Sequence, residues 1–360
     1  MDNSLIINGT LMFKDIEIAK IKNDIVIVQD NPLLPTFFKY RSDNIDLWLK
    51  ERIFDSSRTN VRLLRKILNL RVCPSKEIGI RFHGITLTDC YWIKLENENL
   101  KYKQVSSLSD RLSKSALNGI AFEDFTGNTP EVTNLGSFEK CWVNKNDSWY
   151  LEKIATDTEL FSEILTFRIG TLLGFPMAQY KYDETNNCVS SKDFTNGCKE
   201  FFLDEMKNYL DDDEDYFHNV EFISKLDKGR NLVKQYLDII FMDTLIYNFD
   251  RHTGNYGFLR SCKTGEILSL APNYDNNNAL IAKEYREECN TPAFLIDSFL
   301  DVAKKYKYEI PDVDFSEADK IIDTLINELS IYRKNIRNNI DSNYVKKFLR
   351  NNYNKIKNCI

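Results

Sequence analysis

The sequence predicts an α+β protein built from a mixed N-terminal module, a small β-rich lobe and a large helical lobe. Three patterns predict this order. Short strand-like runs alternate with helical patterns in the first hundred residues. Two strand patterns and one long helix follow, and after residue 198 apolar residues recur almost throughout at three- and four-residue spacing. We expect the boundaries at residues 1–110, 111–195 and 196–360.

The N-terminal module is predicted from short apolar runs. Residues 24–29 (DIVIVQ) and 78–82 (IGIRF) are typical of strands, and residues 61–70 (VRLLRKILNL) are typical of a helix. Together they indicate a small accessory α+β module.

The β-rich lobe is predicted from a hairpin and a helix. Residues 138–143 and 149–154 are strand patterns joined by NKNDS, a turn composition. Residues 158–173 are strongly helical, with Thr158 as the expected N-cap and Gly174 ending the helix. Further strands are expected at residues 179–182 and 188–190.

The helical lobe is predicted from segments such as residues 231–248 and 315–334. A non-helical interruption is expected between residues 249 and 280. The acidic run at residues 210–216 (LDDDEDY) is best explained as a solvated loop. A two-lobed enzyme with its site between the lobes is the natural expectation from this order.

Composition supports a globular chain. The 360 residues are 42% hydrophobic and 28% charged, which provides a core and excludes disordered and collagen-like classes. The net charge of −6 disfavours direct nucleic-acid binding, because such binding depends on Lys and Arg neutralising phosphates.

The compartment is predicted from what the sequence lacks. No stretch approaches about 18 apolar residues, and the N-terminus has no signal-peptide pattern. The eight cysteines form no C-x-x-C pair, and three histidines make a zinc site a poor expectation. We expect a cytoplasmic protein without a membrane span, with secretion as an effector as the alternative.

The most informative segment is residues 246–259, IYNFDRHTGNYGFL, which carries Asp250 and, five positions later, Asn255. Asp-x-x-x-x-Asn is the spacing of a phosphotransfer catalytic loop, in which Asp orients the attacking hydroxyl and Asn binds Mg²⁺. Taken alone, the pattern is better explained as a polar turn after a helix. His252 is expected to be a structural residue of this loop, and Arg251 to contact either a phosphate or an acidic neighbour.

Three further residues complete an ordered set. Asp275, in LSLAPNYDNNNAL, follows Asn255 by 20 residues and can supply the second carboxylate that phosphotransfer needs for Mg²⁺. Lys153 lies on the second hairpin strand, where it can reach phosphates, and Glu163 on the next helix can hold it. Each residue alone is common, but the ordered combination favours a phosphotransfer site.

These residues resemble the HipA-like serine/threonine kinases of bacteria, including CtkA-like members, over residues 127 to 280. TNLGSFEK (133–140) is similar to the phosphate loop of that family, which ends in Gly-x-x-Glu-Lys. The resemblance assigns Gly136, Ser137 and Lys140 to this loop, and Lys153 and Glu163 to contacts that serve ATP.

The catalytic positions follow from the same resemblance. FDRHTGN places Asp250 on the family's catalytic aspartate and Asn255 on its metal-binding asparagine, and LAPNYD places Asp275 on the second metal ligand. The resemblance also implies that a hydroxyl three positions before the loop glycine, here Thr133, can be autophosphorylated. The alternatives are that Thr133 is an ordinary loop hydroxyl or that Thr129 or Ser137 is the acceptor.

Two departures qualify the match. The loop contains one glycine, and residues 1–105 do not look like the family's usual N-terminal subdomain. Asp-Arg-His-x-x-Asn also occurs in the related phosphatidylinositol 3-/4-kinases, but their following His-x-Asp-Phe-Gly is absent here.

The resemblance implies a bilobal protein-kinase-like fold and ATP- and Mg²⁺-dependent phosphorylation of a protein serine or threonine. Its expected partners are ATP, Mg²⁺, a protein substrate and a regulatory, antitoxin-like protein. The alternatives are a lipid or small-molecule kinase and a catalytically silent nucleotide-binding module.

Overall fold

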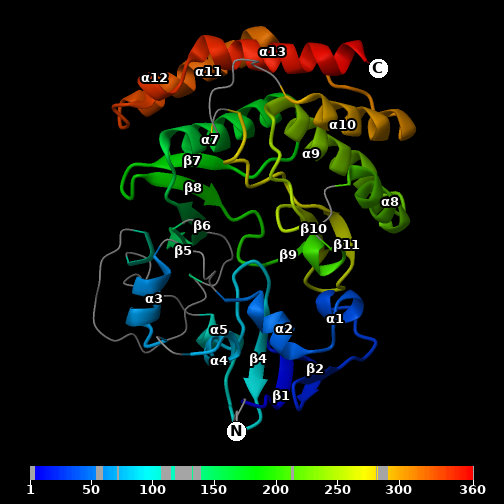
Figure 1. The fold of residues 1–360 in the computed structure, drawn as a ribbon. Helices are drawn as coiled ribbons and strands as arrows, with labels where there is room; N and C mark the ends of the chain where they lie inside the picture. The colour runs from blue at the N-terminus through cyan, green and yellow to red at the C-terminus, as the bar shows by residue number, and fades with distance from the viewer. Residues whose placement is uncertain are drawn as a thin grey trace. The chain divides into compact units, whose positions relative to one another are not determined.

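The computed structural model describes residues 5–53, 60–70, 73–106, 115–117, 132, 139–211, 215–280, 282 and 291–359 (Figure 1). The chain divides into two compact units. The first contains Met1–Ile154, Thr195–Asp204 and Leu259–Ile267, and the second contains Ala155–Phe194, Glu205–Phe258 and Leu268–Ile360. Within the described part of the chain, no helix is long and apolar enough to cross a membrane.

The first unit contains a four-stranded sheet in the order β3-β2-β1-β4. Its strands are β1 (Gly9–Phe13), β2 (Ile16–Lys22), β3 (Ile25–Ile27) and β4 (Tyr91–Leu95). Both neighbours of β1 are antiparallel to it, and every residue of β1 is buried. The strand predicted at residues 24–29 is confirmed by β3.

The first unit also contains short helices. They are α1 (Phe37–Tyr40), α2 (Ile45–Lys50), α3 (Val61–Ile67), α4 (Ser75–Arg81) and α5 (Tyr102–Val105). The predicted helix at 61–70 is confirmed by α3. The strand predicted at residues 78–82 was wrong, because this short apolar run belongs to α4. Gly79 lets α4 pack closely on α2, since a Cβ there would lie 3.0 Å from the Leu49 side chain.

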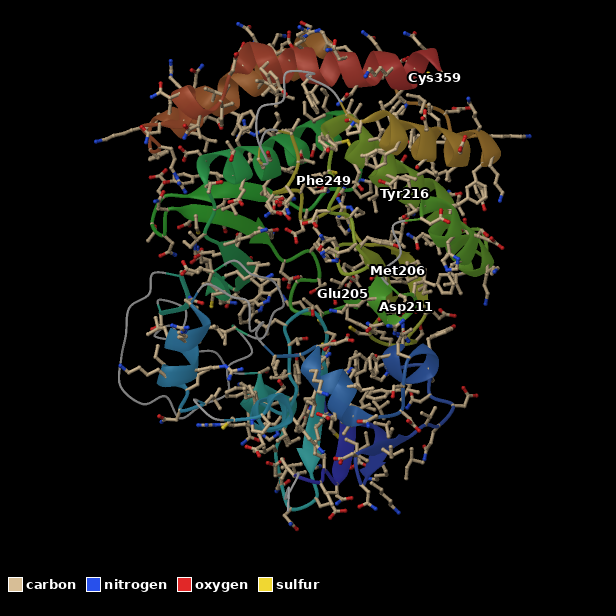
Figure 2. All side chains as sticks on the ribbon, viewed as in Figure 1. Glu205, Met206, Asp211, Tyr216, Phe249 and Cys359 are labelled. Atoms are coloured by element: carbon tan, nitrogen blue, oxygen red, sulfur yellow. The ribbon has the colours of Figure 1, made fainter. Side chains whose placement is uncertain are left out.

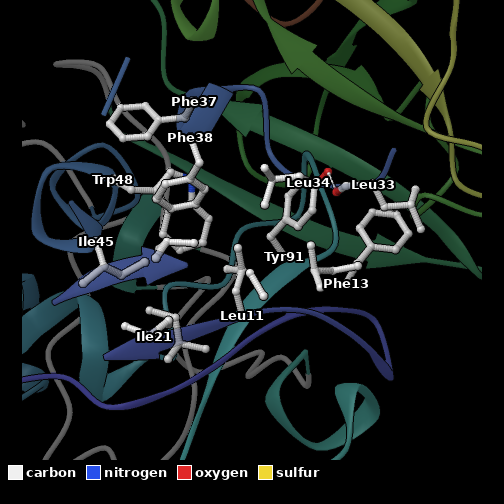
Figure 3. Packing of buried hydrophobic residues seen from close by; sticks show 14 of the residues in the cluster. Leu11, Phe13, Ile21, Leu33, Leu34, Phe37, Phe38, Ile45, Trp48 and Tyr91 are labelled. Atoms are coloured by element: carbon white, nitrogen blue, oxygen red, sulfur yellow. Dashed lines mark hydrogen bonds between the residues drawn. The ribbon is translucent and has the colours of Figure 1, made fainter. Parts of the chain in front are cut away.

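One hydrophobic core of the first unit joins the sheet to α1, α2 and α4 (Figure 3). Phe38 of α1 and Trp48 of α2 pack with their ring centroids 5.6 Å apart. Phe13 of β1 and Tyr91 of β4 pack edge to face at 5.1 Å. Contacts of this kind bury large apolar areas and give the rings a preferred geometry.

The first unit also contains a hairpin upstream of residue 154. It pairs β5 (Lys140–Lys145) with β6 (Ser148–Lys153) in antiparallel register, with Lys140 opposite Lys153. Asn146 and Asp147 form the turn with positive φ angles of 52° and 59°, which two-residue hairpin turns require. The hairpin prediction is confirmed.

In the second unit, α7 (Asp157–Leu172) begins at Thr156. Thr156 and Glu159 form a reciprocal capping box, so the prediction of Thr158 as N-cap was wrong by two residues. Gly174, with φ of +76°, follows the end of the helix as predicted. The two further predicted strands are confirmed as an antiparallel pair, β7 (Tyr180–Asp183) and β8 (Cys188–Lys192).

The remaining helices of the second unit are α8 (Tyr216–Leu226), α9 (Leu232–Ile246), α10 (Ala293–Lys305), α11 (Phe315–Ser330), α12 (Ile336–Asn339) and α13 (Ser342–Asn358). Of these, α8, α10 and α13 pack on the almost wholly buried α9, whereas α11 and α12 pack on α7 (Figure 1). The helix predictions at residues 231–248 and 315–334 are confirmed by α9 and α11. Asp215 belongs to the acidic run at residues 210–216. Its side chain caps α8 by accepting a hydrogen bond from the backbone N–H of Phe217.

One sheet was missed by the prediction of an almost wholly helical chain after residue 198. β9 (Phe201–Glu205), β10 (Gly257–Ser261) and β11 (Ile267–Leu270) form it in the order β11-β10-β9, and a short 3₁₀ helix (Met206–Asn208) follows β9. The chain passes from one unit to the other within each of these strands.

The first unit also contains a buried polar cluster that joins distant segments. Arg260 of β10 donates from Nη1 to Asp204 Oδ2 and to Thr36 Oγ1, both at 2.8 Å. Its Nε donates at 2.8 Å to the carbonyl of Gly265. Gly265 has φ of +70°, and a Cβ there would lie 2.0 Å from the Pro32 carbonyl oxygen.

We expect Gly265→Ala to destabilise the protein by about 2–4 kcal/mol, from the left-handed backbone penalty and the clash with a carbonyl that cannot rotate away. Gly174→Ala is the matched control, because it has a similar φ of +76° and open space around it. It should lose only about 1–2 kcal/mol. Urea unfolding of both variants measures the difference, and equal losses would contradict the prediction.

Candidate functional site

The centre of the candidate site is a buried ion pair between α9 and the loop that follows it. Asp243 lies in the last turn of α9, and Arg251 lies eight residues later. Arg251 Nε donates to Asp243 Oδ2 at 2.9 Å and Nη2 donates to Oδ1 at 2.8 Å, a bidentate arrangement. Their side chains are 2% and 0% exposed, so neither charge can be satisfied by solvent.

The other donors of Arg251 reach two loops. Nη1 donates to the carbonyl oxygens of Asn255 and Tyr274, both at 2.7 Å. Nη2 donates to Asn273 Oδ1 at 2.9 Å and to Asn276 Oδ1 at 2.8 Å. One guanidinium therefore ties the 250–255 loop to the 273–276 loop. Of the two roles expected for Arg251, contact with an acidic neighbour is the one observed.

Electrostatics keep this arginine charged. Burial by itself lowers the pKa of Arg251, but the adjacent Asp243 carboxylate outweighs burial and raises it above its ordinary value. The guanidinium is thus a permanent cation at the centre of the site.

Asp250 and Asn255 lie in one short loop, as the sequence predicts. Asp250 is partly buried, and its backbone carbonyl accepts a hydrogen bond from Asn255 Nδ2 at 3.0 Å. Because the amide nitrogen of Asn255 is used in this way, its Oδ1 is the atom suited to a cation. Phe249, which precedes Asp250, is 40% exposed, and its ring lies 5.5 Å from that of Tyr247 (Figure 2).

His252 supports the loop. It is exposed, and its Nδ1 accepts a hydrogen bond from the backbone N–H of Gly254 at 3.1 Å. Its carbonyl accepts from Asn255 N at 2.8 Å. These contacts agree with the structural role expected from the sequence.

Asp275 has a left-handed backbone, with φ of +59°. Its N–H donates to the Tyr180 hydroxyl at 2.9 Å, which fixes the turn that carries the carboxylate. Burial raises the pKa of Tyr180 well above its ordinary value, and the Glu163 and Asp275 carboxylates add to the shift. Tyr180 therefore remains a neutral phenol between two acidic side chains.

Glu163 of α7 is 1% exposed and accepts a hydrogen bond at Oε2 from the backbone N–H of Asn276 at 2.9 Å. It thus holds the loop that carries Asp275. Lys153 ends β6 and Lys140 begins β5, and both belong to the first unit. Thr133, Gly136 and Ser137 lie outside the described residues.

The structure therefore brings together four of the predicted residues: Asp250, Asn255, Asp275 and Glu163. Carboxylate and carboxamide oxygens are the donors that Mg²⁺ prefers, so Asn255 and Asp275 fit that ion chemically. Sequence reasoning missed the residues that position these four, namely Asp243, Asn248, Asn273, Asn276, Asn278 and Tyr180. For Asp243 a signal existed, because an acid among the apolar residues of a buried helix requires a cation.

No protein-family model matches the sequence, and no curated protein matches it. Among solved structures, the chain is similar to HipA in the Shewanella oneidensis MR-1 toxin–antitoxin complex of HipA, HipB and operator DNA. The identity is 12%, the TM-score is 0.53, and the match covers 98% of this chain and 96% of that one. It is also similar to the Helicobacter pylori proinflammatory kinase CtkA, with 21% identity, a TM-score of 0.39, and coverage of 61% of this chain and 90% of that one.

The likeness to HipA confirms the predicted α+β, HipA-like fold. From the sequence, residues 1–105 do not look like the usual N-terminal subdomain of the family, and this remains an expectation. A match over 98% of the chain takes in most of the N-terminal module.

We expect Asp243→Ala to destabilise the protein by about 3–5 kcal/mol, because it leaves the Arg251 charge buried without its partner. Glu221→Ala is the control, since it breaks the exposed α8 pair with Lys225, whose members are 56% and 68% exposed. That change should cost less than about 1 kcal/mol. Urea unfolding followed by circular dichroism measures both, and a small loss in Asp243→Ala would remove Arg251 from its central role.

Proposed function

We propose that the chain is an ATP- and Mg²⁺-dependent serine/threonine protein kinase of the HipA-like type. The observation that carries the proposal is the set of hydrogen bonds from Arg251, which holds the Asp250–Asn255 loop and the Asp275 loop against each other. A polar turn without function would not need a buried cation to fix two loops that each carry a phosphotransfer residue.

In this proposal Asp250 orients the acceptor hydroxyl and takes its proton as the oxygen attacks the γ-phosphorus of ATP. The bond to the β–γ bridging oxygen breaks, and ADP leaves. Asn255 and Asp275 would hold Mg²⁺, which supplies charge neutralisation at the phosphates when bound. Lys153, Glu163 and the loop residues Gly136, Ser137 and Lys140 would hold the nucleotide.

The proposed partners are a protein with a serine or threonine acceptor and a regulatory, antitoxin-like protein. The similar HipA chain belongs to a complex with HipB, which supports looking for such a protein. The chain itself is a further acceptor, through Thr133.

Mg²⁺-ATP should raise the thermal midpoint, because a ligand of the native state at 100 times its Kd stabilises by about 2.7 kcal/mol. Asp275→Ala should lose most of the Mg²⁺-dependent part. Asp297→Ala, an exposed aspartate of α10, is the control and should keep the full shift. Differential scanning fluorimetry with ATP alone and with Mg²⁺-ATP makes the comparison, and an unchanged shift in Asp275→Ala would refute the metal assignment.

Asp250→Ala should still bind Mg²⁺-ATP but lose about 10²–10⁴-fold in phosphotransfer, because it removes a group that acts in the transition state. Transfer of radiolabelled γ-phosphate to lysate proteins measures the loss. Mass spectrometry of residues 126–140 in both proteins tests autophosphorylation, with phosphate on Thr133 expected only when Asp250 is intact. Undiminished transfer in the variant would rule out this catalytic loop.

A further inference from the structure

Resting on the proposed function, we propose that Asn278 is a positioning residue for Asp250, one that holds one carboxylate oxygen so that the other faces the acceptor hydroxyl. Asn278 lies three residues after Asp275, in the segment LSLAPNYDNNNAL, and no role was expected for it from the sequence. Its Nδ2 donates a hydrogen bond to Asp250 Oδ2.

The backbone on both sides of Asn278 is anchored. Before it, Asn276 N donates to Glu163 of α7 at 2.9 Å, and the Asn276 side chain accepts from Arg251 at 2.8 Å. After it, the carbonyl of Ala279 accepts from Ser162 Oγ at 2.8 Å, and Leu280 N donates to the Ile246 carbonyl at 2.7 Å.

These anchors bury the neighbours and leave Asn278 at the surface of the site. Asn276, Asn277, Ala279 and Leu280 are buried, whereas Asn278 is partly exposed like Asp250. A side chain on so rigid a backbone has its direction set before any ligand binds, which is the property that a positioning residue needs.

The contact fixes the carboxylate on one side only. In the described part of the chain, the hydrogen bond from Asn278 is the one hydrogen bond that the Asp250 carboxylate makes. Asn248 Oδ1 accepts from the Asp250 backbone N–H at 3.3 Å and so restrains the main chain as well. With Oδ2 held, the carboxylate cannot rotate without loss, and Oδ1 keeps its acceptor sites for a hydroxyl proton.

The chemistry of the donor also matters. An amide donates a hydrogen bond without adding a positive charge, so it orients the carboxylate and leaves its negative charge in place to attract a proton. The nearby cation, Arg251, directs its donors to Asp243, the Asn255 and Tyr274 carbonyls and other side-chain amides, none of which is the Asp250 carboxylate.

The test measures ATP hydrolysis and transfer of radiolabelled phosphate to casein by the full chain. The variants are Asn278→Ala, Asn278→Asp and, as control, Asn338→Ala on the exposed side of α12. Asn278→Asp keeps the size of the side chain but cannot donate, so it answers if the alanine variant folds poorly. We expect kcat to fall about 10–100-fold in both Asn278 variants, with the KM for ATP unchanged. The control should match the parent.

A double-mutant cycle separates positioning from a merely structural role. In an Asp250→Ala background, Asn278→Ala should cause little further loss of the residual rate, because its effect passes through the missing carboxylate. A further loss equal to that seen in the parent would overturn the proposal, as would kcat within twofold of the parent in both single variants. If the parent and the control bind Mg²⁺-ATP but transfer phosphate neither to casein nor to water, the proposed function itself fails.

Discussion

The second unit depends on one interaction, the buried pair of Arg251 and Asp243. Desolvating two charges is expensive, and the cost is offset only when every donor and acceptor is used. Arg251 meets this condition by bonding to acceptors from α9 and from two loops. Lysine could not replace it, because an ammonium group lacks the planar fork that reaches several acceptors at once. Of the residues with proposed chemical roles, Asn255 bonds to Arg251 through its backbone carbonyl only, and the Asp250 carboxylate is not among the acceptors of Arg251.

This arrangement divides stability from chemistry. The buried side chains of Asp243, Asn248 and Asn276 bond to one another or to Arg251, while Asp250 and Asp275 remain partly exposed. The backbone of Asp275 is held in the same way. Its positive φ is a conformation that non-glycine residues seldom adopt, and the hydrogen bond to Tyr180 and the adjoining turn maintain it. Hydrogen bonds within the two loops therefore fix the backbone of Asp250 and Asp275, while both side chains stay partly exposed.

The sequence was informative where local rules decide the outcome. Periodicity predicted α7, α9 and α11, and the turn residues Asn146 and Asp147 predicted the β5–β6 hairpin. Prediction from the sequence failed where a partner distant in the chain determines the secondary structure. The IGIR segment became helical by packing on α2, and β9 depends on strands formed some fifty residues later. For the site, spacing predicted Asp250, Asn255 and Asp275, but nothing local identifies Asn276 or Asn278 among so many asparagines.

The five passages of the chain between the units, after residues 154, 194, 204, 258 and 267, have a consequence for biosynthesis. Thr36 and Asp204 are made long before Arg260, the cation that they share in the folded first unit. The first unit therefore cannot be completed on the ribosome until residue 267 has emerged, by which time much of the second unit has also been made. Contacts between residues 224 positions apart in the chain form slowly. Apolar strands of the nascent chain therefore stay exposed to aggregation until these contacts form.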